Sequence, residues 1–124
     1  MEHAVSAFYP DVAHGCGLTM LSVAYFSDLA ERRPERFAEL AQAMGEKVDL
    51  LPESERAFAF IRALEKLIQA VGLADETLSK YGVRKSDIPE LARNAFSAMG
   101  GLFKVTPVKQ EQADVERIFR RAYR

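Results

Sequence analysis

Apolar side chains recur at intervals of three and four residues along much of the chain, the spacing that places them on one face of an α-helix. The clearest series lies in residues 88–99 and comprises Ile88, Leu91, Ala92, Ala95, Phe96 and Met99. Asp87 and Glu90 resemble a capping pair at the start of this helix. Gly100 and Gly101 favour its end, because glycine readily adopts the left-handed conformation that terminates helices.

Four further segments are predicted to be helical. Residues 53–71 carry apolar side chains in alternating steps of four and three, and we expect the longest helix here. Pro34 suits the first turn of a helix that ends before Gly45. Residues 114–122 have acidic side chains early and arginines late, which matches the helix dipole, and the interrupted apolar run 18–26 indicates a buried helix. The inward side chains of the second segment are expected to be Phe37, Leu40, Ala41 and Met44.

The connecting segments favour an all-α fold. No alternating run of β-branched residues occurs except near Pro107, and proline argues against a central strand. Residues 46–52, 81–86 and 102–110 contain glycine, proline or charge and are predicted to be loops too short to link domains. We therefore expect a multi-helix bundle that forms a single helical domain over residues 1–124.

Composition narrows the classes of partner. With 48% hydrophobic residues among 124, the chain can bury the core of one domain. Its 17 basic and 18 acidic residues nearly cancel, so nucleic acid is not an expected partner. The single cysteine, Cys16, suits a reducing, cytoplasmic setting. No basic and apolar leader follows Met1, and residues 18–26 fall far short of the roughly 20 apolar residues of a membrane span.

Both histidines, His3 and His14, lie near the start of the chain. Neutral imidazole is a common metal ligand and also suits proton transfer, but the two rings can meet only if the chain turns around Pro10. Two ordinary surface or core histidines remain an open alternative. So does an unrelated helical metal protein, which needs acidic ligands nearby. Glu2 and Asp11 are the candidates, and we expect both to be solvated.

Residues 1–15, MEHAVSAFYPDVAHG, resemble the histidine-rich signature of iron-containing alcohol dehydrogenases. A looser similarity to the closing helices of that family continues in residues 78–83, 87–92 and 114–123, so the resemblance covers essentially the whole chain. In that family a nucleotide-binding α/β domain precedes a helical domain, and an iron or zinc ion between them is bound by one aspartate and three histidines. The resemblance implies a C-terminal helical domain whose N-terminal nucleotide-binding domain is missing from this chain.

The resemblance also implies roles for single residues. His14 matches the last metal ligand, and His3 matches a neighbouring histidine beside substrate and nicotinamide, the catalytic candidate for relaying a proton. Phe8 is the candidate for lining the substrate pocket, although helix packing explains it equally well. The preceding ligand histidine would lie upstream of Met1, and the aspartate, its companion histidine and the glycine-rich turn are missing too. The stretch between the histidines is one residue longer than usual, and Ala13 stands where many members have proline.

The implied function is that of an NAD(P)-linked, metal-dependent oxidoreductase that interconverts alcohols with aldehydes or ketones. Its cofactors would be Fe2+ or Zn2+ and NAD(P), and its partners the missing nucleotide-binding domain and a small alcohol or aldehyde. We expect this chain to be inactive alone, because one imidazole cannot hold the metal and nothing orients a nicotinamide. The alternative is a free-standing helical interaction module without chemistry that pairs with itself as a homo-oligomer.

Overall fold

The computed structural model describes residues 1–124 and contains α-helices and short turns but no β-strand, which confirms the all-α prediction. The α-helices are α1 (Glu2–Phe8), α2 (His14–Arg32), α3 (Pro34–Ala43), α4 (Glu53–Ala70), α5 (Ile88–Phe103) and α6 (Gln112–Ala122). Single 3₁₀ turns are η1 (Val48–Leu50), η2 (Ser79–Tyr81) and η3 (Lys85–Asp87). None of the helices is both long enough and apolar enough to cross a membrane.

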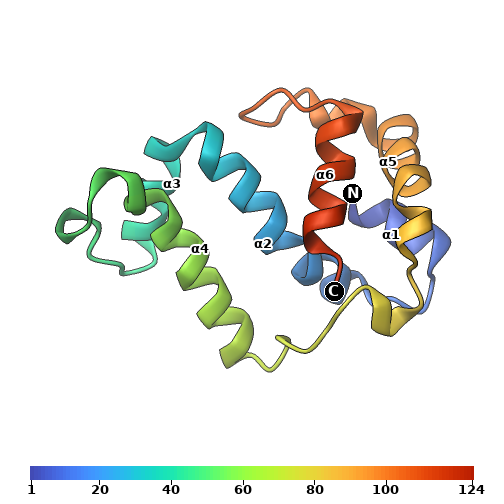
Figure 1. The fold of residues 1–124 in the computed structure, drawn as a ribbon, viewed down its shortest axis with the longest axis horizontal. Helices are drawn as coiled ribbons and strands as arrows, with labels where there is room; N and C mark the ends of the chain where they lie inside the picture. The colour runs from blue at the N-terminus through green and yellow to red at the C-terminus, as the bar shows by residue number, and fades with distance from the viewer.

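Helix α2 runs through the middle of the molecule, with α3 and α4 on one side and α1, α5 and α6 on the other (Figure 1). Its first half contributes Met20, Leu21 and Ala24 to a cluster of 16 buried residues shared with α1, α5 and α6. Its second half contributes Leu29 and Ala30 to a cluster of 9 buried residues shared with α3 and α4. Both apolar clusters therefore depend on this one helix.

Aromatic rings join α2 to the α3–α4 pair. The ring of Phe60 on α4 lies edge-on to Phe26 of α2 and to Phe37 of α3, with centroid distances of 5.6 and 5.4 Å. Such edge-to-face pairs contribute about 0.5–1.5 kcal/mol each beyond the burial of their area. The three rings thus fix the angle at which α3 and α4 meet α2.

A group of charged side chains joins α2 to α6. Asp28 is 4% exposed, and its Oδ1 accepts hydrogen bonds from the Arg117 guanidinium at 2.6 and 3.2 Å. Arg32 lies 3.2 Å from the other oxygen of Asp28 and donates to Asp114 at 2.6 Å. A buried carboxylate is costly without partners, so these two arginines offset the cost of burying Asp28 in the interface.

The structure corrects three expectations about helix ends. Helix α2, with 19 residues, is longer than α4, with 18. Helix α5 does not stop at Gly100: its backbone is distorted at Met99 (φ −130°, ψ 25°), and helical turns continue to Phe103, whose ring stacks on Phe96 at 4.4 Å. The stacking of Phe103 on Phe96 stabilises this last helical turn, which the two glycines alone would not favour. Asp87 occupies the N-cap position of α5 but makes no side-chain capping hydrogen bond, because its carboxylate accepts hydrogen bonds from Arg84 instead.

The inward face predicted for α3 is also only partly correct. Phe37 and Ala41 are buried, but Leu40 is 37% and Met44 is 41% exposed. Met44 lies beyond the last helical residue, so the helical period no longer directs its side chain inward. The helices predicted after Glu53 and toward the C-terminus end within two residues of the observed ends, whereas the apolar run 18–26 marks only the middle of α2, which extends from His14 to Arg32.

The same glycine-to-alanine change should have opposite effects at two exposed positions. Gly101→Ala should raise the free energy of unfolding by about 0.5–1 kcal/mol, because alanine is favoured over glycine inside a helix. A Cβ at Gly101 would meet no atom within 4 Å. Gly82→Ala should lower it by about 1 kcal/mol, because an L side chain is strained in the left-handed region. Gly82 has φ +81° and equally open surroundings. Urea unfolding followed by circular dichroism measures both, and destabilisation by Gly101→Ala would show that α5 ends earlier.

Asp114 should make stability depend on acid pH. Burial opposes its ionisation, but the Glu111 N–H and the Arg32 and Arg117 guanidinium groups outweigh this and lower the pKa of Asp114 to about 2. A lowered folded-state pKa contributes stability that is present above the unfolded value of about 3.9 and is lost as the pH falls toward the folded value. Asp114→Asn should therefore cost about 1–2 kcal/mol near neutral pH, and this gap should narrow below about pH 4.

The control for this prediction is Asp49→Asn, which changes an exposed aspartate of η1. Urea unfolding of the three proteins at neutral pH and near pH 3 would measure the gap. A difference between wild type and Asp114→Asn that stays constant with pH would contradict the assignment.

Candidate functional site

The structure brings the two histidines together. Helix α1 ends at Phe8, the chain turns through Pro10, and the Val12 N–H donates to the Tyr9 carbonyl at 3.1 Å before α2 begins. The ring centroids of His3 and His14 lie 5.4 Å apart, with 58° between the ring planes. Both side chains are exposed, so the pair faces outward at the start of α2.

The turn between the histidines is anchored to the start of α5. The Tyr9 hydroxyl donates a hydrogen bond to the Asp87 carboxylate, and Val12 is buried in the larger apolar cluster. The Arg84 guanidinium, followed by the Tyr9 hydroxyl, holds the pKa of Asp87 well below its usual range. Partial burial, followed by the hydrogen bond to Asp87, raises the pKa of Tyr9. The anchor therefore joins a carboxylate to a protonated phenol over the neutral range.

Glu2 is buried, contrary to the expectation that it is solvated. It is 4% exposed, and its Oε1 accepts a hydrogen bond from Ser6 Oγ at 2.5 Å while its Oε2 contacts Nδ1 of His14. A Cβ added at Gly17 would lie 2.9 Å from both Cγ and Oε1 of Glu2, so the glycine makes room for this carboxylate. Asp11 is exposed, as expected.

An apolar groove adjoins Glu2. It encloses about 440 Å³ between the start of α1, one face of α2 and the last turns of α5, and Glu2 is the only charged side chain that lines it. Tyr25 and Phe26 of α2 contribute aromatic surface there. Phe8, the predicted substrate-pocket residue, is 45% exposed at the end of α1 and does not line this groove.

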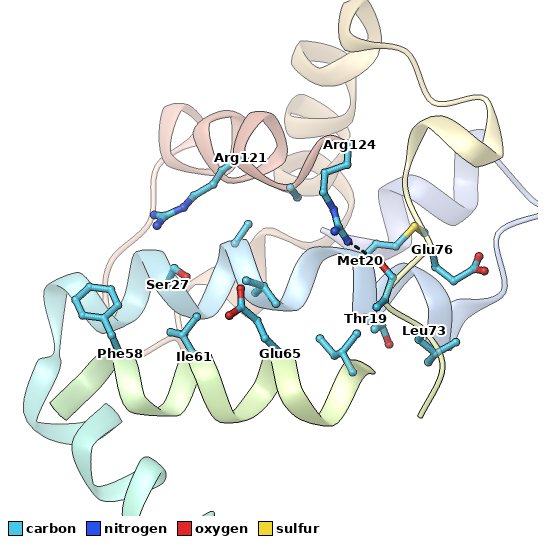
Figure 2. A pocket seen from close by; sticks show the side chains of 15 residues that line it. Thr19, Met20, Ser27, Phe58, Ile61, Glu65, Leu73, Glu76, Arg121 and Arg124 are labelled. Atoms are coloured by element: carbon cyan, nitrogen blue, oxygen red, sulfur yellow. Dashed lines mark hydrogen bonds between the residues drawn. The ribbon is translucent and has the colours of Figure 1, made fainter. Parts of the chain in front are cut away.

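A second cleft lies away from the histidines, between α2, α4 and the end of α6 (Figure 2). Arg121 and Arg124 stand on its α6 side, with Glu65 of α4 opposite, and Arg124 donates to the Ala74 carbonyl at 3.3 Å. Arg121 is already paired with Glu31 outside the cleft, at 2.9 Å. None of the predicted site residues lines this cleft, and sequence periodicity gave no signal for it.

His14 fits one position of a metal site. Its side chain is 57% exposed and Nδ1 lies against Oε2 of Glu2, so Nε2 is the nitrogen that remains open to a further partner. Neutral imidazole suits both iron and zinc. No group of three histidine, cysteine, aspartate or glutamate side chains in residues 1–124 is arranged to hold a metal ion. His14 is therefore a candidate ligand, and residues 1–124 contain no complete metal site beside it.

Comparison with known families identifies the kind of domain that this chain forms. Residues 1–123 match the family described as "Fe-containing alcohol dehydrogenase family, C-terminal". The chain belongs to the iron-containing alcohol dehydrogenase family. It corresponds to the C-terminal helical domain of that family, as the resemblance in the histidine segment implied.

Individual relatives agree with this assignment. The chain is 32% identical to 1,3-propanediol dehydrogenase of Citrobacter freundii and 29% identical to the long-chain primary alcohol dehydrogenase AdhA of Thermoanaerobacter ethanolicus. Each match covers 99% of this chain but 31% of the relative. A solved 1,3-propanediol oxidoreductase superposes with a TM-score of 0.86 at 27% identity, over 98% of this chain and 31% of that one. The chain thus spans about a third of the length of these relatives.

Removing the Tyr9 hydroxyl should loosen the turn that carries His14. Tyr9→Phe keeps the ring but loses the hydrogen bond to Asp87, so the free energy of unfolding should fall and the Val12 amide should exchange faster with solvent. Amide hydrogen exchange followed by NMR measures both effects.

Tyr123→Phe is the matched control, because it makes the same chemical change at the end of α6. The Tyr123 hydroxyl donates to the Val83 carbonyl over a longer distance, 3.3 Å. Exchange at Val12 should be unchanged in this variant. Equal protection of Val12 in the Tyr9→Phe variant and the wild type would show that the anchor does not hold the turn.

Proposed function

We propose that this chain is the helical part of an NAD(P)-linked, metal-dependent alcohol dehydrogenase that interconverts alcohols with aldehydes or ketones. The observation that carries the proposal is the His14 imidazole, exposed at the first residue of α2 in a chain that lacks a complete metal site of its own. A nucleotide-binding domain, in the remaining two-thirds or so of the relatives' length, would supply the other ligands and bind the nicotinamide.

Each predicted site residue has a separate task in this proposal. His14 donates Nε2 to the metal, and iron or zinc, when bound, acts as a Lewis acid on the alcohol oxygen. His3, whose ring contacts that of His14, holds or moves a proton at its imidazole beside the substrate. Phe8 presents an exposed aromatic face at the end of α1 and covers the apolar part of a small alcohol or aldehyde.

The physical limits of the chain support inactivity in isolation. A single imidazole cannot fix the coordination geometry of an ion, and orienting hydride donor and acceptor requires a second binding surface. The single, partly buried cysteine suits a cytoplasmic enzyme, and the expected partners are the nucleotide-binding domain and the substrate.

The isolated chain should give no turnover above the buffer rate. The test supplies NADH or NADPH, Fe2+ or Zn2+, and a panel of short aldehydes, and follows nicotinamide absorbance. Turnover by the 124 residues alone would contradict the proposal. A metal-free dimer without affinity for nucleotide would instead favour the free-standing interaction module.

A chimera should separate the roles of the two histidines. This chain replaces the matching C-terminal part of the Citrobacter freundii 1,3-propanediol dehydrogenase, and the product is assayed for metal content and propanediol oxidation. His14→Ala should remove the metal and the activity together. His3→Ala should retain the metal and lower kcat by about 10²–10⁴-fold, the usual contribution of a proton-transfer group. Full metal content in the His14→Ala chimera would refute the assigned ligand.

A further inference from the structure

Glu2 is a buried acidic residue beside His14 to which the proposed function assigns no role. It lies in the first turn of α1, is 4% exposed and faces His14 rather than solvent. A carboxylate in such a place is unfavourable unless each oxygen finds a donor. The hydrogen-bond donors around the Glu2 carboxylate therefore indicate why this side chain is buried.

The two carboxylate oxygens have different partners. Ser6, one helical turn further along α1, donates its hydroxyl to Oε1 at 2.5 Å. Oε2 makes no hydrogen bond in the structure, and the polar atom that lies against it is Nδ1 of His14. With Oε1 occupied, the carboxylate cannot turn away without breaking the Ser6 hydrogen bond. Ser6 thus directs Oε2 toward His14.

Gly17 provides the space that the Glu2 side chain occupies. It is buried on α2, and a Cβ there would approach Cγ and Oε1 of Glu2 to 2.9 Å, closer than real Cβ atoms come to other atoms. Gly15, on the exposed side of the same turn of α2, has open space where its Cβ would lie. The absence of a side chain therefore has a steric purpose at Gly17 but not at Gly15.

We infer that Glu2 is a positioning residue for His14: its carboxylate accepts the Nδ1–H proton and so holds the neutral imidazole with Nε2 unprotonated and directed outward. A metal-binding histidine commonly donates its other ring N–H to a carboxylate, which fixes the tautomer and the ring orientation and makes the ligand nitrogen more basic. The inference rests on the proposed function in one respect, namely that His14 is a metal ligand. The tautomer itself is a property of the chain alone.

Two substitutions remove the interaction in different ways. Glu2→Gln keeps the volume but loses the charge, and its amide can offer Nδ1 a donor as well as an acceptor. Gly17→Ala leaves Glu2 and His14 unchanged and displaces the carboxylate sterically. Gly15→Ala is the matched control, because it adds the same methyl group on the same turn of α2 without touching Glu2. Circular dichroism checks that each variant is folded. If Gly17→Ala does not fold, the isosteric variant Glu2→Gln alone tests the inference.

The first measurement is the ring tautomer, by long-range ¹H–¹⁵N NMR correlations of ¹⁵N-labelled chain under conditions in which His14 is neutral. Wild type and Gly15→Ala should show His14 protonated on Nδ1, whereas Glu2→Gln and Gly17→Ala should shift the population toward the Nε2–H form. A wild-type ring protonated mainly on Nε2 would overturn the inference.

The second measurement is Zn2+ binding, titrated into each chain and followed by the backbone amide shifts of residues 1–17, with His14→Ala as the reference without the ligand. Glu2→Gln and Gly17→Ala should weaken binding at His14 by roughly 10-fold or more, the usual effect of losing such a partner, and Gly15→Ala should leave it unchanged. Unchanged affinity and tautomer in folded Glu2→Gln would overturn the positioning role while His14 remains a ligand. Zn2+ binding that His14→Ala does not alter would instead refute the proposed function. Zn2+ coordinated by Glu2 itself would also overturn the inference.

Discussion

The burial of α2 from both sides is the constraint on which the rest of the structure depends. Its first half closes the apolar cluster with α1, α5 and α6, and its second half closes the cluster with α3 and α4. Between the two, Asp28 binds Arg117 of α6 and thereby fixes the rotation of α2 about its own axis. His14 is the first residue of this helix, so its position is determined by two cores rather than by a flexible loop.

Periodicity predicted those helices that are buried along one face. The expected helix over residues 53–71 is observed as Glu53–Ala70, because a steady alternation of apolar and polar positions reflects burial from a single direction. Helix α1 was not predicted, since seven residues give too few periods to detect. The end of α5 could not be predicted either, because the Phe96–Phe103 contact that extends it is a tertiary interaction.

The part of the candidate site that lies in one contiguous sequence motif could be predicted. His3 and His14 could be chosen from the residues around them, and their approach required only a turn at Pro10. Glu2 was considered only as an acidic metal ligand, and its burial could not be predicted, because it depends on the missing side chain at Gly17, on a different helix. A small residue that packs against an acidic one is recognised only from the three-dimensional structure. A single sequence contains both residues but does not show that they are in contact.

An incomplete site has a physical consequence for the proposed enzyme. When the ligands of one ion come from two polypeptide segments, each segment alone binds the ion weakly, and coordination favours the assembled state. The cost of assembly falls if each contributed ligand is already in its binding orientation, because less rotational freedom of the side chain is lost. An imidazole at the start of a doubly packed helix, with one nitrogen engaged by a buried carboxylate, meets this condition. In the proposed enzyme, the packing of α2 on both sides and the burial of Glu2 would together hold a single nitrogen in a fixed direction.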